Sequence, residues 1–420
     1  MGHNRPMRIV LVRAPFINTD TGAPIGLAYL QGALQNHSVT VIDFNLDINN
    51  HIGITYADFS RNFTLNKNHP ALTYGYSRLD DYCEKIMKSK PDVVGFYLSY
   101  STVDFSIPMA KKLKREGIRL IAGGPEAAYR ASELIESGIF DTIVVGYGEE
   151  AVKKAIYEPG IIELPLDREK EYVPNYKGIE FKRYGERIPI ITTRGCPNSC
   201  KFCTQHLRYY YHSIDSVVKQ IASIPRKSKI IFNDSNLNVN VKRTKELFSR
   251  VSEVIGDRSI HAFGMQVDTR FNEYLDEYAR CKFDELRLGI ESGSLKLRQE
   301  MGKPFFSNLA AREMIKNMTS CGTKVWVQFI FCYPSETNED REETLHLMEE
   351  IVKENPLEKI EIYWYRFVVH HGTEQLFQDQ YGVVTRTIMD WENKIYSPRI
   401  VEEIAEGIQT RLPPKARLFL

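Results

Sequence analysis

The chain has 420 residues, a length that predicts two or three domains. Its hydrophobic fraction of 43% and charged fraction of 26% are those of an ordinary globular protein, and a net charge of +1 argues against a general nucleic-acid binder. No apolar run approaches the roughly 20 residues that span a bilayer, and the N-terminal residues lack the apolar core of a secretory signal. We therefore expect a cytoplasmic protein that binds neither membranes nor nucleic acid.

The first 150 residues alternate short β-branched runs with stretches of helical periodicity. The runs stand at residues 7–13, 39–43, 93–98, 120–124 and 142–145, and helical patterns lie at 26–34, 106–116 and 131–137. Alternating short strands and helices are typical of a doubly wound parallel sheet. We predict a Rossmann-like α/β domain over residues 1–150, followed at residues 151–185 by a linker rich in charge and proline.

Small and polar residues follow the predicted strands of this first domain. The carboxyl ends of parallel strands form a ligand-binding edge, and glycine there lets a ligand approach the backbone closely. Two alternatives remain: single glycines of this kind often only turn the chain, and a Rossmann module can bind nothing. The candidate cofactor-binding residues at this edge are Pro24, Gly26, Ser99, Gly123, Gly124, Gly146, Gly148 and Glu149.

Three cysteines, Cys196, Cys200 and Cys203, follow in the spacing C-x3-C-x2-C on one loop. Three thiolates there can hold three irons of a 4Fe–4S cluster and leave the fourth iron open for a substrate. The alternative is structural zinc, for which His206 would complete a Cys3His set, but structural zinc usually takes its ligands from two separated knuckles. The remaining cysteines are scattered, so we expect free buried thiols and no disulfide framework at Cys83, Cys281, Cys321 and Cys332.

A second series of strands begins just before the cysteines. Apolar runs at residues 188–192, 229–232, 260–266, 285–290, 325–331 and 360–365 alternate with helical stretches. Six strand–helix repeats predict a partial (β/α)6 barrel over residues 186–375, with its polar residues at the carboxyl-terminal mouth. Residues 376–420 form a C-terminal region with a helical pattern and no chemical motif; we expect it to cover the barrel mouth or bind substrate.

The cysteine loop and the ends of these strands resemble the radical S-adenosylmethionine (SAM) enzymes over about residues 186–375. The resemblance implies that the three cysteines hold a 4Fe–4S cluster and that SAM chelates its open iron. Asp234, Ser235 and Ser292 are also good helix N-caps, which is the structural alternative for them. By position, the resemblance implies an adenine contact at Phe202, methionine-amino contacts at Asn233, Asp234 and Ser235, ribose and methionine contacts at Glu291 and Ser292, an adenine contact at Gln328, and contacts from the barrel centre at Gln266 and Arg270.

The first domain resembles the cobalamin-binding domain that precedes many radical SAM domains. The resemblance lies in its ordered glycines and in the helix Gly26-Leu-Ala-Tyr-Leu30, and it implies cobalamin at the candidate edge. No Asp-x-His-x-x-Gly follows the first strand, so no histidine is marked as the lower ligand of cobalt. That face of the cofactor is then empty or covered by the loop at residues 14–24. We interpret His37 as a structural turn histidine.

Together these resemblances imply a cobalamin-dependent radical SAM methyltransferase. In that family a 5′-deoxyadenosyl radical takes a hydrogen from an unactivated carbon, which then receives a methyl group from methylcobalamin, and no side chain need act as a base. We expect a peptide or protein side chain as substrate and an external electron donor. Alternatives are a radical SAM cyclase or oxidoreductase without methyl transfer, and a non-catalytic Fe–S or zinc protein. A methylthiotransferase would need more cluster cysteines before Cys196, where only Cys83 stands.

Overall fold

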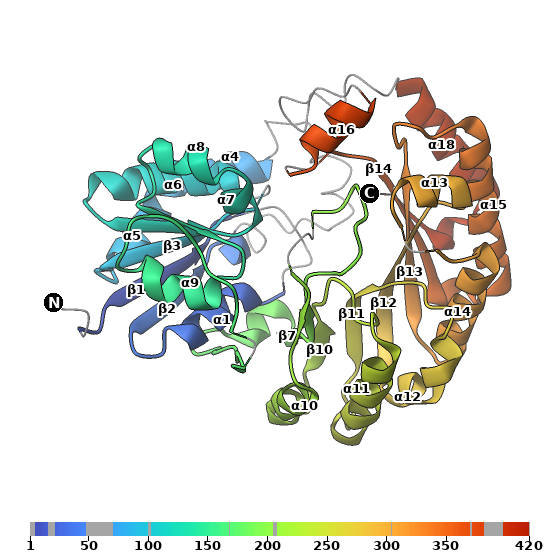
Figure 1. Cartoon of the computed structure of the whole chain (residues 1–420), viewed down its shortest axis with the longest axis horizontal. Helices are drawn as coiled ribbons and strands as arrows, with labels where there is room; N and C mark the ends of the chain where they lie inside the picture. The colour runs from blue at the N-terminus through green and yellow to red at the C-terminus, as the bar shows by residue number, and fades with distance from the viewer. Residues whose placement is uncertain are drawn as a thin grey trace. The chain divides into compact units, whose positions relative to one another are not determined.

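The computed structural model describes residues 5–15, 22–47, 70–99, 102–167, 169–204, 208–303, 305–369, 372–381 and 398–419. The chain divides into two compact units, unit 1 (Met1–Gly185) and unit 2 (Glu186–Leu420). Each is an α/β structure built on its own parallel sheet (Figure 1). Within the described residues, no helix combines the length and apolar character needed to span a membrane.

Unit 1 contains a six-stranded parallel sheet in the order β2-β1-β3-β4-β5-β6. Its strands are β1 (Arg8–Arg13), β2 (Ser38–Asp43), β3 (Val93–Tyr97), β4 (Arg119–Gly123), β5 (Thr142–Val145) and β6 (Gly160–Glu163). Its helices are α1 (Ile25–Ala33), α4 (Pro70–Ser77), α5 (Leu79–Met87), α6 (Val103–Arg115), α7 (Pro125–Tyr129), α8 (Ala131–Glu136) and α9 (Gly148–Ala155). The strand order reverses between β1 and β3, which makes their carboxyl ends the switch point where doubly wound sheets bind ligands.

Both faces of this sheet are buried, which explains its nearly continuous apolar strands. In β1, Val10 and Val12 pack on one side with α5 and α6, whereas Ile9 and Leu11 pack on the other side with α1 and α9. Each such fully buried side chain contributes roughly 1.5–3 kcal/mol to folding. The predicted doubly wound sheet is therefore confirmed.

The segment 151–185, which we predicted to be a linker, is an integral part of unit 1. It contains the end of α9 and strand β6, which pairs in parallel with β5. Further along, the backbone N–H of Asn175 donates to the carbonyl of Ala28 (2.9 Å), and the Gln31 amide donates to the carbonyl of Lys177 (3.0 Å). The segment thus lies along α1. The linker prediction was wrong because a four-residue strand among charges leaves little apolar signal.

Unit 2 contains a seven-stranded parallel sheet in the order β15-β14-β13-β12-β11-β10-β7. The strands are β7 (Arg187–Ile190), β10 (Lys229–Phe232), β11 (Ile260–Met265), β12 (Phe283–Glu291), β13 (Lys324–Phe331), β14 (Ile360–Arg366) and β15 (Arg417–Phe419). The helices are α10 (Ile214–Ser223), α11 (Val241–Val254), α12 (Leu275–Arg280), α13 (Leu295–Glu300), α14 (Asn308–Ser320), α15 (Asn338–Glu354), α16 (Glu374–Tyr381) and α18 (Pro398–Arg411). The six predicted strands are all present.

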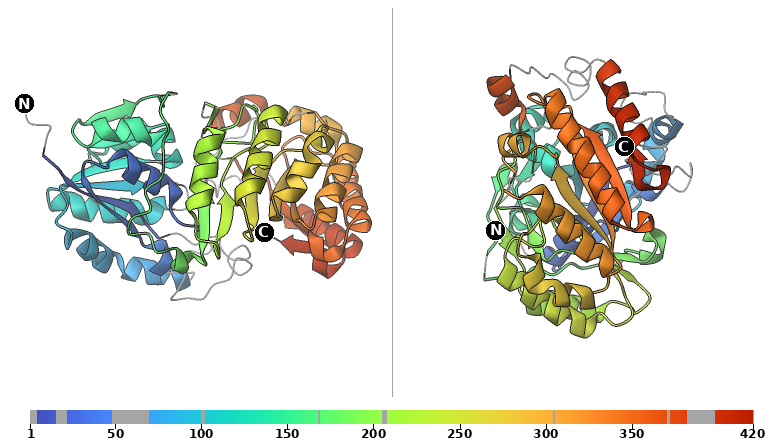
Figure 2. Two further views of the ribbon diagram at one scale, coloured as in Figure 1. Left: turned by 90° about the horizontal axis from the view of Figure 1, so that it is seen from below. Right: turned by 90° about the vertical axis from the view of Figure 1, so that its right-hand side faces the viewer.

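Helices α10, α11, α12, α14, α15 and α18 of unit 2 lie along one face of its sheet (Figure 2). Residues on that face, such as Ile260, Leu286 and Val325, form the main hydrophobic core with them. Alternate residues point to the other face, where the Arg287 guanidinium lies 4.7 Å from the Trp326 ring centroid. The two faces therefore differ in polarity, as expected for the wall of a partial barrel.

The C-terminal region contains a helix at the predicted helical pattern and a strand that the sequence did not predict. Strand β15 pairs with β14 as a seventh strand, and Ile404 and Ile408 of α18 join the main core. Three residues are too few to show the alternation of apolar and polar residues that marks a strand, so β15 was not predicted.

Candidate cluster and cofactor site

The three cysteines lie on the loop between two short antiparallel strands, β8 (Thr193–Arg194) and β9 (Tyr210–Tyr211). Cys200 is buried, and Cys196 and Cys203 are partly buried. The backbone N–H of Cys203 donates to the carbonyl of Cys200 (3.0 Å), which closes a tight turn. His206, the zinc-ligand alternative, lies outside the described residues.

The chemistry of this donor set fits a cluster. Burial raises the pKa of the Cys200 thiol to about 11, and although Lys303 lowers it, the neighbouring thiols and Glu291 raise it further. A thiolate there is therefore favoured only when a metal neutralises it. In the described part of the chain, no three His, Cys, Asp or Glu side chains converge closely enough to hold a single metal ion. Thiols that each bind a different iron of a cluster do not need to converge.

A half-buried arginine of α11, Arg243, holds both flanks of the cysteine loop. The Arg243 guanidinium donates to the carbonyl of Thr192 before the cysteines (3.1 Å) and to that of His212 after them (2.9 Å). The central carbon of this guanidinium also lies 5.1 Å from the Tyr211 ring centroid. Because Arg243 is 40 residues or more from each cysteine in the chain, the cysteine motif gave no signal of its role.

Asp234 supports the same loop through one of its two carboxylate oxygens. Its Oδ1 accepts hydrogen bonds from the backbone N–H of Thr192 (2.8 Å), from the backbone N–H of Thr193, and from the Thr193 hydroxyl (2.9 Å). It is 3% exposed, and burial raises its pKa to about 6. Its neighbours Asn233 and Ser235, also predicted to contact SAM, are exposed. The segment after β10 thus lies against the cysteine loop, and Oδ2 of Asp234 is buried with no hydrogen-bond partner among the described residues.

Asn236, a residue that the sequence analysis missed, contacts the cysteine loop directly. Its Nδ2 lies 3.6 Å from the Cys196 sulfur and donates to Oε1 of Gln266 (2.9 Å). The same Gln266 oxygen accepts from Asn198 of the cysteine loop (2.9 Å). The structure therefore brings the predicted residue Gln266 to the cysteines. Arg270, in contrast, is 54% exposed and pairs with Asp268 (3.3 Å), beside a surface cavity of about 610 Å³ at the start of α11.

Glu291 and Phe202 meet at Lys303. The ammonium group of Lys303 lies 2.7 Å from a Glu291 oxygen and 5.9 Å from the Phe202 ring centroid. Glu291 has a φ of 72°, a strained conformation for a non-glycine residue and one that clusters at functional sites. A Cβ on Gly289 would lie 2.4 Å from the Glu291 carboxylate, so only glycine leaves room for this pair.

The other predicted residues of β12 and β13 have internal partners. The Ser292 hydroxyl pairs with that of Thr344 (2.9 Å) and is fully buried. Gln328 donates to the Tyr365 hydroxyl (2.9 Å). The N-cap alternatives for Asp234, Ser235 and Ser292 were wrong, because the capping residues are Asn240 for α11 and Ser294 for α13.

The predicted cobalamin residues share the carboxyl edge of the unit 1 sheet. Pro24 and Gly26 lie at the start of α1, Ser99 follows β3, Gly123 ends β4, and Gly146 follows β5. Their sites differ in available space. Among the described residues, no atom lies within 4 Å of a Cβ built on Gly26 or Gly146, so the backbone is open there.

Two other glycines at this edge have packing roles. A Cβ on Gly124, where φ is +106°, would lie 2.5 Å from the carbonyl of Leu98, and one on Gly148 would lie 2.8 Å from the Leu30 side chain. Glu149, in the first turn of α9, is 2% exposed. The open edge at Gly26 and Gly146 therefore fits a large flat cofactor better than the crowded positions do.

The loop after β1, predicted to cover cobalt, lies partly outside the described residues, at 16–21. Its described end is held by Arg13, whose guanidinium donates to the carbonyl of Gly22 (3.1 Å) and to Asp43 (2.9 Å). The Tyr184 hydroxyl also donates to Asp43 (2.7 Å). His37 accepts from the backbone N–H of Met7 (3.2 Å), which is a structural turn contact.

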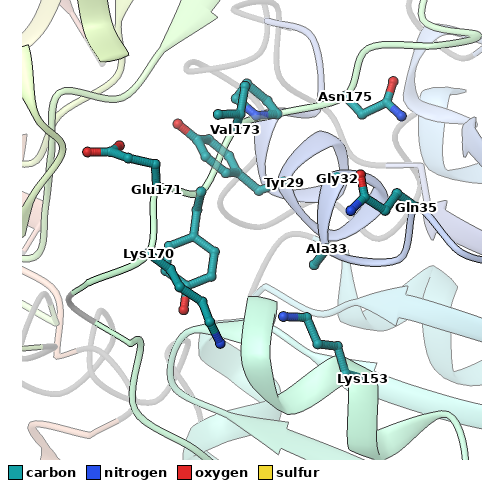
Figure 3. Close-up of a pocket in the computed structure, with 11 residues that line it drawn as sticks. Tyr29, Gly32, Ala33, Gln35, Lys153, Lys170, Glu171, Val173 and Asn175 are labelled. Carbon is teal, nitrogen blue, oxygen red and sulfur yellow. The ribbon is translucent and has the colours of Figure 1, made fainter. Parts of the chain in front are cut away.

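A cavity of about 500 Å³ lies elsewhere on unit 1 (Figure 3). It is lined by the later part of α1, including Tyr29, by Gln35 just after α1, by Lys153 of α9, and by residues 170–175. None of the predicted cobalamin residues lines it. Lys153 and Lys170 both approach Glu150, at 2.8 Å and 3.5 Å, so their charges are already partnered.

Comparisons with known proteins match both units. Residues 190–348 match the family profile of the radical SAM superfamily, and residues 19–156 match that of the B12 binding domain. The first match contains the three cysteines and the ends of β10 to β13. The second contains every predicted cobalamin residue.

Three similar proteins extend these matches. A protein named as an uncharacterized methyltransferase in Pyrococcus horikoshii is 24% identical over 387 residues, which cover 81% of this chain and 77% of the relative. A protein of Methanocaldococcus jannaschii, named provisionally as a methylthiotransferase, is 29% identical over 297 residues, 61% of this chain and 64% of the relative. The radical SAM methyltransferase TsrM of Kitasatospora setae, solved with cobalamin and a 4Fe–4S cluster, has a TM-score of 0.72 at 14% identity and covers 99% of this chain and 93% of TsrM. At that identity, the likeness to TsrM shows a shared fold.

Proposed function

Because this chain belongs to the cobalamin-dependent radical SAM enzymes, we propose that it methylates an unactivated carbon of a peptide or protein side chain. Its cofactors are a 4Fe–4S cluster, SAM and cobalamin. The observation that carries the proposal is the cysteine loop of unit 2, which is surrounded by the Asn236 amide and the Lys303–Glu291 pair. When bound, these cofactors supply a substrate radical and a transferable methyl group.

The side chains of unit 2 would hold and orient these groups. Cys196, Cys200 and Cys203 would each bind one iron. Lys303 keeps its positive charge, since burial lowers its pKa but Glu291 and two of the thiols raise it by more. A cation beside three thiolates offsets part of their mutual repulsion. The second oxygen of Glu291 is then the acidic group available to a bound zwitterion.

The choice of an amino-acid side chain as substrate is supported by one relative. TsrM has been solved with tryptophan as substrate. A residue within a peptide presents similar side-chain chemistry. An external one-electron donor would reduce the cluster, because SAM cleavage consumes an electron.

The test uses anaerobically reconstituted chain with SAM and a low-potential reductant, with and without cobalamin. We expect mass spectrometry to detect 5′-deoxyadenosine and S-adenosylhomocysteine, the second only when cobalamin is present. A Cys200→Ala variant should lose 5′-deoxyadenosine. If 5′-deoxyadenosine forms but no S-adenosylhomocysteine depends on cobalamin, a cyclase or oxidoreductase is favoured.

The substrate is tested separately with SAM that carries a deuterated methyl group. We expect the label on peptides or proteins from the source lysate, bonded to carbon and stable to acid and base. Label found only on small molecules would overturn the peptide proposal. Label that arrives together with an added sulfur would instead favour the reaction for which the Methanocaldococcus relative is named.

A further inference from the structure

The backbone of Asn236 is held on two sides. Its carbonyl accepts from the Thr193 hydroxyl (3.0 Å), and the next N–H, that of Leu237, donates to the carbonyl of Gly264 (3.0 Å). A Cβ on Gly264 would lie 2.7 Å from the carbonyl of Asp234, so this close approach of loop and strand requires glycine. The backbone from which the Asn236 side chain projects is therefore fixed relative to β8 and β11.

The orientation of the Asn236 amide follows from its neighbours. Nδ2 carries two hydrogens and has two acceptors, Oε1 of Gln266 at 2.9 Å and the Cys196 sulfur at 3.6 Å. An amide rotated by half a turn would place Oδ1 against the sulfur, which repels oxygen strongly once it is a thiolate. The donor therefore faces Cys196. Oδ1 is buried and has no partner among the described residues.

This contact lies in a dry environment. Asn236 is 4% exposed, and hydrogen bonds are electrostatically stronger where water is excluded. When a cluster gains an electron, negative charge increases on its sulfur ligands. A hydrogen bond donated to one of those ligands stabilises the reduced form more than the oxidised form.

We propose that Asn236 is a positioning residue that raises the reduction potential of the cluster through an N–H···S hydrogen bond to Cys196. The inference rests on the proposed assignment of the three cysteines as cluster ligands and adds a residue that tunes the bound cluster. The hydrogen bond makes the cluster easier for an external donor to reduce. It requires no change in the ligands themselves.

The experiment compares the reduction potentials of reconstituted full-length variants in the absence of SAM. The reduced cluster is followed by electron paramagnetic resonance during a potentiometric titration. Asn236→Leu keeps the size of the side chain but removes the donor, and we expect its midpoint potential to become more negative. Asn236→Ala tests the same loss without the added methyl groups, in case leucine prevents cluster assembly. The matched control, Asn198→Ala, removes the other donor to Gln266 but leaves the contact with Cys196, and its midpoint should not change.

The results distinguish a failure of the proposed function from a failure of the proposed role of Asn236. A wild-type chain that assembles no 4Fe–4S cluster would overturn both the proposed function and this inference. A midpoint unchanged in both Asn236 variants, with full iron content, would overturn the inference alone. Exchange into deuterium oxide gives a second readout: wild type should show a deuterium coupling to the reduced cluster that Asn236→Leu lacks.

Discussion

The ammonium group of Lys303 lies 2.7 Å from the carboxylate of Glu291, and both side chains are almost buried, at 13% and 11% exposure. The pair joins the end of β12 to the segment that follows α13. That segment is itself attached to the cysteine loop, because the N–H of Lys201 donates to the carbonyl of Met301 (2.9 Å). One ion pair therefore connects the predicted SAM strand with the cluster loop.

Replacing Lys303 by methionine should destabilise the chain strongly. The change leaves the Glu291 carboxylate buried without its partner, a loss that typically costs about 3 kcal/mol or more. The pKa of Lys303 is raised, so the pair should contribute throughout the neutral range and weaken only above the ordinary pKa of lysine. Anaerobic thermal unfolding at neutral pH measures the effect.

The control is Lys229→Met, which breaks an ion pair with Asp284 (3.1 Å) whose lysine is 51% exposed. Exposed pairs contribute about 0–1 kcal/mol, so its unfolding temperature should hardly change. Equal losses in the two variants would contradict a special role for Lys303.

Arg243 should determine how long the cysteine loop retains its iron. Arg243→Lys replaces a planar guanidinium with a single ammonium group, which cannot reproduce both bonds to the flanking carbonyls. We expect iron to be lost several-fold faster when the reconstituted chain is exposed to a chelator. Arg250→Lys, on the same helix, changes surface contacts with Asp215 (3.0 Å) and Glu253 (3.7 Å) and should behave as wild type. If both variants lost iron at the same rate, the proposed role of Arg243 in retaining iron would be refuted.

The sequence predicted the strands well but the site residues unevenly. The predicted strands have long apolar runs, whereas β6 and β15, with four and three residues, have too few positions to show a period. The loop after β10 contacts the cysteine loop, and its contact with SAM stays a prediction. The backbone conformation of this turn decides which of its polar side chains faces the cysteines. In the structure that side chain is Asn236. The pairing of Lys303 with Glu291 depends on the path of the chain after α13, so no sequence pattern predicted it.

Cobalamin should bind at the edge near Gly26 and not in the cavity of Figure 3. Gly26→Phe fills an open part of the edge, and because no described atom lies within 4 Å of its Cβ, the fold should be kept. We expect weaker cobalamin binding in a titration followed by visible absorbance. Gln35→Phe obstructs the cavity and should leave binding unchanged. The reverse pattern would place cobalamin in the cavity.

Glu336 should make the stability of unit 2 depend on pH. Its side chain is 3% exposed, and burial raises its pKa to about 7, although the backbone N–H of Cys332 (2.7 Å) and Arg341 act in the opposite direction. The folded chain therefore holds a proton that the unfolded chain has released. Stability should fall as the pH rises from about 4.5 to about 7, by up to about 3 kcal/mol.

A Glu336→Gln variant remains neutral at every pH and keeps an acceptor for the N–H of Cys332. It should be more stable than wild type above pH 7 and should show a smaller change in unfolding temperature across the acidic range. The control Glu342→Gln, at an α15 position that is 62% exposed, should keep the wild-type pH profile. A Glu336→Gln profile parallel to that of wild type would mean that the carboxyl group stays ionised in the folded chain, and that its contacts with Cys332 and Arg341 outweigh its burial.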